Sequence, residues 1–233
     1  MQYHMMEVNV KSKFNMVICF ILLLLLSGCT KDVIKSTPPV QTVRELKEIE
    51  TDYSNSVSVQ NNVFTVLYSE IYQQPIELTY TSTDRPKNVD RDDGGYNWFT
   101  EEGIITSDND DYYDNPWDRG HIAPAATYSD SQENLLQTFS FLNCALQKDN
   151  LNRGEWRELE EMERVWDDTE NLIIDVTIKF SDSVLPTGAR IPFSFRKCIT
   201  FIDQGSTRCF EFPNKDTNKN WTEYEVQNGR SKY

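Results

Sequence analysis

The sequence predicts an α+β domain whose central sheet is mainly antiparallel. Short segments rich in β-branched and aromatic residues are bounded by turns with glycine, proline or polar residues, which is typical of strands. Two other segments space their apolar residues as amphipathic helices do. Strand and helix segments alternate irregularly, as in α+β folds. The 233 residues, of which 38% are hydrophobic, suffice for one domain with a core.

The N-terminal segment has the features of an export signal. Lys11 and Lys13 precede the apolar run 16–26, which is too short for a membrane span of about 20 residues but fits a signal peptide. The following Leu-Ser-Gly-Cys ends at Cys29 and resembles the bacterial lipobox, in which the cysteine carries lipid after cleavage. Residues 1–28 are therefore predicted to be a lipoprotein signal peptide and Cys29 the lipid attachment site. The predicted location is the bacterial cell envelope, periplasmic or outer surface, and an ordinary secretory leader is the alternative.

Residues 29–58 are polar and lack a sustained apolar face, so they are predicted to be a tether with a short helix at 42–50. The folded domain is predicted to span 59–233. Its strands are predicted at 63–80 (two strands broken at Gln73-Gln74-Pro75), 140–147, 171–180 and 194–212 (a hairpin).

Two helices are predicted among these strands. Residues 129–139 begin with Ser and Asp, which are good helix caps, and continue with helical spacing. Residues 151–166 carry a helical apolar stripe that includes Trp156 and Trp166, and both rings are predicted to lie in the core. Residues 84–116 are predicted to form a loop.

Three cysteines follow Cys29, and their scattered positions do not form a zinc-binding pattern. In an oxidising compartment a disulfide is permitted, and Cys198 and Cys209 flank the predicted hairpin. Direct pairing needs a turn centred on residues 203–204, whereas Gly205 indicates a centre further on. The pairing therefore stays open.

The charge balance restricts the function. With 23 basic and 37 acidic residues the formal charge is −14, which argues against a protein that coats nucleic acid by bulk electrostatics. It does not exclude an enzyme whose cleft is locally basic, because nearby charges set the field of a site.

The histidines restrict the chemistry further. The chain has His4 and His121, and His4 lies in the predicted signal peptide. A zinc site with two or three histidines is therefore excluded, and no G-x-S-x-G motif supports a serine hydrolase. A lone histidine next to Arg119 suits the activation of water against a phosphodiester, with the arginine and a divalent cation bearing the phosphate charge.

Two motifs extend this interpretation. The sequence Asp-Arg-Gly-His at 118–121, with Pro124, resembles the DRGH motif of the DNA/RNA non-specific endonucleases, the ββα-metal (His-Me finger) nucleases that include endonuclease G. The second motif is the family's Leu-Asn-x-Gly-x-Trp-x-x-Leu-Glu, to which residues 151–160 are similar. Further similar segments lie in the family's order at 138–139, 143–147, 191–197 and 210–214, and the resemblance covers roughly 63–214. One departure is Leu146, where the family usually has proline, and this leaves the local loop geometry open.

The resemblance implies a ββα-metal nuclease fold with a mainly antiparallel central sheet flanked by helices. It implies a sugar-non-specific endonuclease that hydrolyses phosphodiester bonds of DNA and RNA and depends on Mg²⁺, with Mn²⁺ as an alternative. The expected partners are DNA and RNA substrates and, through the N-terminal lipid, the membrane. The sequence indicates no protein partner.

The resemblance also implies roles for single residues. His121 would be the general base, Asn152 the one direct protein ligand of the metal, and Glu160 the residue that orders the metal's waters. Asn143 would position the histidine region and substrate. Arg119 and Arg164 would hold phosphate or stabilise the leaving charge, and either Arg85 or Arg91 would be the family's upstream arginine.

Each role has a plainer alternative. Asn152 and Glu155 have the spacing of a helix capping box, and Glu160 and Arg164 that of a solvated ion pair on a helix surface. A lone histidine such as His121 is often structural. Two alternative functions remain open: a non-catalytic nucleic-acid-binding or ligand-binding lipoprotein, and a phosphodiesterase for small nucleotides.

Overall fold

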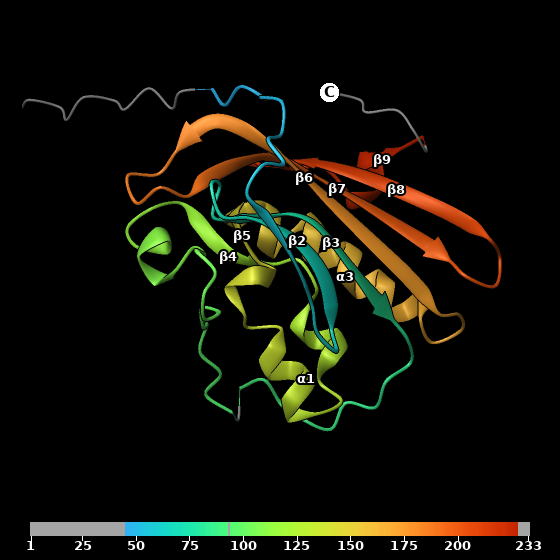
Figure 1. Cartoon of the computed structure of the whole chain (residues 1–233). Helices are drawn as coiled ribbons and strands as arrows, with labels where there is room; N and C mark the ends of the chain where they lie inside the picture. The colour runs from blue at the N-terminus through green and yellow to red at the C-terminus, as the bar shows by residue number, and fades with distance from the viewer. Residues whose placement is uncertain (1–44, 93, 228–233) are drawn as a thin grey trace, which may run out of the picture. The chain divides into compact units, whose positions relative to one another are not determined.

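The computed structural model describes residues 45–92 and 94–227. The predicted signal peptide, Cys29, His4 and residues 30–44 of the tether lie outside these ranges. The described chain forms an α+β domain, which confirms the predicted fold class (Figure 1). Its main sheet has seven antiparallel strands in the order β1-β2-β3-β6-β7-β8-β9. These are β1 (Ser56–Gln60), β2 (Phe64–Ser69), β3 (Gln74–Ser82), β6 (Leu172–Val184), β7 (Arg190–Phe201), β8 (Ser206–Pro213) and β9 (Glu225–Val226).

The domain begins earlier than residue 59. β1 pairs along its whole length with β2, although Ser56–Gln60 overlaps the predicted tether. Upstream of β1, Glu48 forms an isolated bridge with Ser181 of β6. The helix predicted at 42–50 is wrong over its described part, because residues 45–50 contain no helical residue. β1 is an edge strand with few apolar residues, so the sequence has no strong strand pattern there.

The helices and the second sheet fill the space beside the main sheet. They comprise α1 (Gln132–Gln137), α2 (Asp149–Arg153), α3 (Glu155–Trp166), β4 (Trp117–His121) and β5 (Cys144–Lys148). α3 packs against the main sheet through Trp156, which is 1% exposed and contacts Phe195 and Phe212. The strand predicted at 140–147 begins later, because Phe141–Asn143 forms the 3-10 turn η3.

The helix predicted at 151–166 is interrupted at Gly154. This residue separates α2 from α3 with φ −107° and ψ −113°. A Cβ at this position would lie 2.6 Å from the carbonyl oxygen of Asn150, so the break needs a glycine. Asn152 consequently lies in α2 and does not cap α3, and the capping-box alternative is wrong.

We expect Gly154→Ala to destabilise the domain by about 1–3 kcal/mol, because the new methyl group forces the helix junction apart. Thermal unfolding of the purified protein measures the change. Arg157→Ala, at an exposed position three residues later in α3, is the matched control and should leave the melting temperature nearly unchanged. Equal melting temperatures for both variants would contradict a junction that requires glycine.

β4 and β5 form a separate antiparallel pair, in which His121 lies opposite Cys144. Side-chain amides connect this pair to the main sheet. Gln74 Oε1 accepts from the backbone N of Leu146 at 2.9 Å, and Asn214 Nδ2 donates to the carbonyl oxygens of Leu146 and Pro192. Leu146 thus uses an N–H that the family's usual proline would lack, and the loop geometry that the sequence left open is that of a regular strand.

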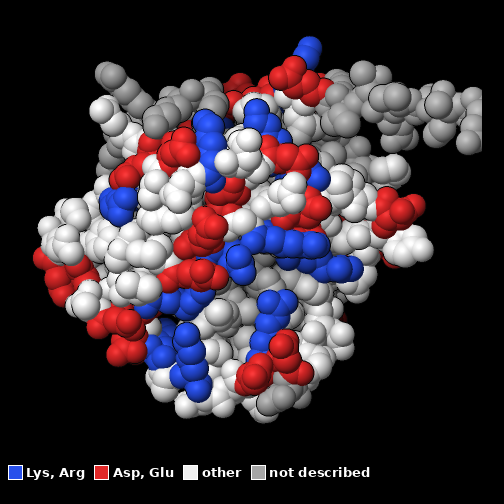
Figure 2. Space-filling model, turned by 180° about the vertical axis from the view of Figure 1, so that it is seen from behind, with Lys and Arg blue, Asp and Glu red and all other residues white. Residues whose placement is uncertain are grey.

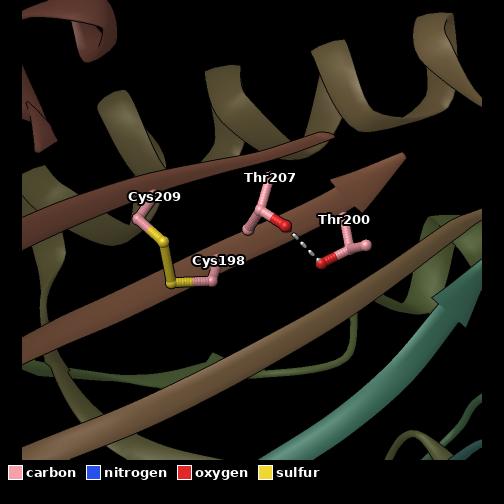
Figure 3. Close-up of a disulfide and its surroundings, with 4 residues drawn as sticks. All are labelled: Cys198, Thr200, Thr207 and Cys209. Carbon is pink, nitrogen blue, oxygen red and sulfur yellow. Dashed lines mark hydrogen bonds between the residues drawn. A yellow bond between two sulfur atoms is a disulfide. The ribbon is translucent and has the colours of Figure 1, made fainter. Parts of the chain in front are cut away.

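Cys198 and Cys209 form a disulfide between β7 and β8 (Figure 3). They are direct cross-strand partners, with a Cα–Cα distance of 4.0 Å. The turn is centred where direct pairing requires it, and Gly205 takes its last position with φ 63°. The nearby Thr200 and Thr207 hydroxyls are 3.0 Å apart. Cys144 is free and buried.

Candidate active site

His121 ends β4 and lies in an aromatic setting. Its ring centroid is 4.4 Å from that of Trp98 and 5.1 Å from that of Phe139. Phe99 holds Trp98 in place, because its backbone N–H and C=O bond to Phe139 and Phe141. The Nε2 atom of His121 is buried and has no hydrogen-bond partner within the described residues. Burial and the charge of Arg91 lower the pKa of His121 to about 3, so the ring is neutral at physiological pH.

Two side chains hold the backbone at His121 and just after it. Trp156 Nε1 donates to the His121 carbonyl oxygen at 3.3 Å, which connects β4 to α3. Asn143 is fully buried; its Oδ1 accepts from Ala123 N, and its Nδ2 donates to the carbonyl oxygens of Ala123 and Thr138. Asn143 therefore positions the histidine loop. Direct contact with substrate, which the resemblance also implied, does not fit this burial.

The predicted metal ligand Asn152 is oriented by Asp118. Asn152 Nδ2 donates to Asp118 Oδ2 at 3.0 Å, and Arg153 binds both carboxylate oxygens of Asp118. No hydrogen bond occupies Asn152 Oδ1 among the residues that the structure describes. The amide is thus fixed with its oxygen available to a cation, as outer partners commonly orient metal ligands.

Glu160 lies one helical turn after Trp156, on the same side of α3. Its Oε1 is buried and lacks a hydrogen-bond partner in the described chain, and Lys197 Nζ is 4.0 Å away. Burial raises the pKa of Glu160 to about 7, although Lys197 and Arg164 oppose the shift. No ion pair joins Glu160 to Arg164 among described residues, so the solvated-pair alternative is wrong.

The four candidate arginines lie in three places. Arg91 lies near the imidazole, over the Phe139 ring at 5.5 Å. Arg119 lies over Tyr112 at 5.1 Å, and no carboxylate in the described ranges pairs with it. Arg85 and Arg164 line one cavity of about 200 Å³, where Arg85 Nε and Arg164 Nη1 are buried without partners. Arg91 thus lies near His121 and Arg85 beside Arg164, so both residues remain candidates for the family's upstream arginine.

Residues 42–230 match the family described as DNA/RNA non-specific endonuclease, which is most of the chain. The chain belongs to this family. The comparison supports the resemblance carried by the two motifs. The solved structure of the EndoG/EndoGI complex has a similar fold, with a TM-score of 0.64 and 20% identity over 72% of this chain and 79% of that one.

Curated relatives match shorter segments. Mitochondrial nuclease EXOG of Danio rerio is 33% identical over 85 residues, which is 36% of this chain and 22% of that protein. A nuclease of Syncephalastrum racemosum is 35% identical over 113 residues, 48% of this chain and 32% of that protein. Mitochondrial endonuclease G of Homo sapiens is 41% identical over 56 residues, 24% and 19%. The chain thus spans between a fifth and a third of these relatives.

The residues present fit a single hard cation held mainly by water. Within the described ranges no group of three or more His, Cys, Asp or Glu residues could enclose a metal. The free Oδ1 of Asn152 offers one oxygen ligand, and Glu160 Oε1 is a buried acceptor without a donor. One amide ligand with an outer carboxylate suits Mg²⁺, which usually retains several waters.

Sequence reasoning missed two residues of this site. Asp118 was read only as part of the motif, although it orients both Asn152 and Arg153. Gln147 lies opposite Asp118 in β5, with both amide atoms buried and unpartnered in the described chain. Its side chain fills the space where a Cβ on Gly120 would collide, which explains the glycine of the motif. Both residues lie within the segments that resemble the family, and this was the signal in the sequence that could have identified them. Their roles become visible only when the pairing of β4 with β5 is known.

Proposed function

We propose that the protein is a Mg²⁺-dependent, sugar-non-specific endonuclease that hydrolyses phosphodiester bonds of DNA and RNA. The observation that carries the proposal is a set of unused polar atoms on the two motifs. His121 Nε2 and Glu160 Oε1 are buried without partners, and Asn152 has a free Oδ1, all within the described residues. Unmet buried polar atoms such as the first two are costly. A water-rich catalytic centre would supply partners to both of them and to the free Oδ1 of Asn152.

In this mechanism neutral His121 accepts a proton from the attacking water. The aromatic contacts and the bond from Trp156 fix the ring, so that no reorganisation is needed when the proton moves. Asn152 would hold the cation, with Glu160 accepting hydrogen bonds from its waters. When bound, Mg²⁺ supplies charge stabilisation for the phosphate oxygens. Arg119 lies two residues before His121, on the same face of β4, and would bind the phosphate.

Lack of sequence preference follows from these groups. Arginine and a hydrated cation contact phosphate, which carries no base information. The net charge of −14 does not prevent such binding, because the charges are not evenly spread. Figure 2 shows a band of Lys and Arg side chains across one face of the protein, bordered by acidic side chains. Such a band can bind a phosphate backbone locally.

A cleavage assay tests the function. Supercoiled plasmid, a structured RNA and a small diester such as bis(p-nitrophenyl) phosphate are incubated with Mg²⁺, with Mn²⁺ or with EDTA. We expect both polymers to be cut internally with either cation and neither to be cut with EDTA. Hydrolysis of the diester alone would favour the small-substrate phosphodiesterase, and binding without hydrolysis would favour the non-catalytic lipoprotein.

The location is a proposal as well. In the described part of the chain no helix is long and apolar enough to cross a membrane. We infer a lipid anchor at Cys29 from the apolar run and the lipobox-like sequence before it.

We expect Cys29→Ala to release the protein from bacterial membranes or to leave it as unprocessed precursor, because the modified thiol is lost. Fractionation and intact-protein mass spectrometry measure this. Ser27→Ala, which keeps a small residue before the cysteine, is the control and should stay membrane-bound. A Cys29→Ala protein of mature size that remains in the membrane fraction would exclude this anchor.

A further inference from the structure

Lys197 is a buried cation that the proposed mechanism does not use. It lies on β7 beneath α3 and is 0% exposed. Its Nζ donates to Glu163 Oε1 at 2.9 Å and to the Tyr80 hydroxyl at 3.1 Å. A fully buried ammonium is costly unless it is paired and hydrogen-bonded. Glu163 and Tyr80 meet that requirement, so stability alone needs no further partner.

A second carboxylate nevertheless shares this lysine. Glu160 Oε1 lies 4.0 Å from Lys197 Nζ, which is within ion-pair range but too long for a hydrogen bond. Glu163 is engaged on both sides, since its Oε2 also accepts from the Tyr80 hydroxyl at 2.6 Å. Glu160 Oε1 keeps its acceptor capacity free. The Lys197 ammonium thus faces two carboxylates: both oxygens of Glu163 accept hydrogen bonds, whereas Oε1 of Glu160 accepts none within the described chain.

Lys197 also reaches the histidine side of the site. Its Nζ lies 4.0 Å from the centre of the Trp156 ring, in cation–π contact. The Nε1 atom of the same indole donates to the His121 carbonyl oxygen. A single buried side chain therefore touches both the residue that holds His121 and the carboxylate of Glu160.

We propose that Lys197 is a positioning residue that keeps the Glu160 carboxylate ionised and in place for its role at the metal's waters. This inference rests on the proposed function. Four titratable groups face Glu160: Lys197 from β7, Glu163 and Arg164 from α3, and Tyr80 from β3. Burial and Glu163 raise the pKa of Glu160, whereas Lys197 and Arg164 lower it. Of the two cations, Lys197 lowers the pKa of Glu160 more than Arg164 does.

The test must separate this role from that of a counter-ion for Glu163. Lys197→Met alone leaves Glu163 as an unpaired buried charge and can unfold the protein. The double variant Lys197→Met/Glu163→Gln removes both charges together, and the new amide can still accept from the Tyr80 hydroxyl. We expect this variant to fold with a melting temperature near that of the wild type.

Relative to Glu163→Gln alone, which already lacks the opposing charge of Glu163, we expect plasmid hydrolysis by the double variant to fall about tenfold or more at pH 7 and the acid limb of its pH–rate profile to move up by roughly one unit or more. Activity should partly return above pH 8. In a Glu160→Gln background the same two substitutions should cost less than about twofold, because Lys197 acts through Glu160. A double variant with the rate and profile of Glu163→Gln alone would overturn the proposal, as would an equal loss in both backgrounds.

A measurement without substrate separates the two proposals. The carboxyl ¹³C resonance of Glu160, assigned with Glu160→Gln, is titrated in Glu163→Gln and in the double variant, which differ only at Lys197. We expect its midpoint to rise when Lys197 is neutralised, because its charge lowers the pKa of Glu160, and an unchanged midpoint would overturn the role of Lys197. A wild-type protein that cuts no nucleic acid would instead refute the proposed function, and the titration would still decide the electrostatic role.

Discussion

His121→Ala is expected to abolish nearly all nucleic-acid hydrolysis while the domain stays folded. A general base contributes about 10²–10⁴-fold, so the rate should fall by that amount. The fold should survive because the hydrogen bond from Trp156 reaches the backbone of His121, which alanine retains. Plasmid nicking under single-turnover conditions measures the rate, and circular dichroism measures the fold.

Tyr113→Ala is the matched control for this variant. Tyr113 is 82% exposed in the loop before β4, and its loss should leave the rate nearly unchanged. Free imidazole is expected to restore part of the rate in the His121 variant by entering the space that the His121 ring leaves beside Trp98 and Phe139. An alanine variant within about threefold of the wild-type rate would contradict a general-base role.

The pH dependence refines this prediction. An ordinary histidine would give an acid limb near ~6.5. Burial and Arg91 instead lower the pKa of His121 to about 3, so its neutral form prevails throughout the working range. An acid limb near neutrality would come from Glu160, whose pKa burial raises to about 7. We therefore expect the rate to rise with pH through about 7 and the residual activity of Glu160→Gln to lack this limb.

The same shift affects stability. Between about pH 3 and 6.5 the unfolded chain protonates His121 and the folded chain does not. The contribution of the neutral ring is therefore present above pH 6.5 and is lost as the pH falls toward 3. Denaturant titrations should show a flatter acid dependence in His121→Ala than in the wild type.

Asn152→Ala should reduce activity by orders of magnitude and abolish specific Mg²⁺ binding in calorimetry. The reason is the loss of Oδ1, the oxygen that Asp118 orients through the other atom of the amide. Asn150→Ala is the matched control. It removes a side chain of the same helix whose hydrogen bond, among the described residues, goes to Asp216, and it keeps the backbone bond from residue 150 to Asp149. It should leave turnover and metal binding nearly unchanged. Wild-type activity of Asn152→Ala at saturating Mg²⁺ would contradict its role as ligand.

Much of the fold could be predicted from periodicity and turn residues, including the strands around Gln74, the long apolar strand β6 and the β7–β8 hairpin. The junction at Gly154 could not, because it depends on the approach of Asn150's carbonyl, and a periodic apolar stripe runs through it unchanged. Strand β1 was not predicted for a similar reason, because its five residues are recognised as a strand only from their pairing with β2.

The site divides in the same way. The two motifs indicate which residue types belong to the site. The structure adds the contact between the motifs, in which Trp156 of the second donates a hydrogen bond to the backbone of His121 in the first. Contacts between distant segments leave no local pattern. Lys197 follows Glu160 by 37 positions and reaches it only because β7 passes beneath α3. The orientation of Asn152 by Asp118 likewise depends on α2, which follows β5 directly and brings Asn152 to β4.

The attachment of β4 and β5 to the main sheet has a consequence for how the protein opens. The seven-stranded sheet is joined by continuous backbone ladders, whereas amides of Gln74 and Asn214 carry the hydrogen bonds described between the two sheets. A strand pair that is hydrogen-bonded to its neighbour through two side chains can separate at a lower free energy than strands joined by a continuous backbone ladder. The strand that bears His121 should therefore exchange its amide protons with solvent before β6 and β7 do, so that inactivation by heat or denaturant precedes global unfolding.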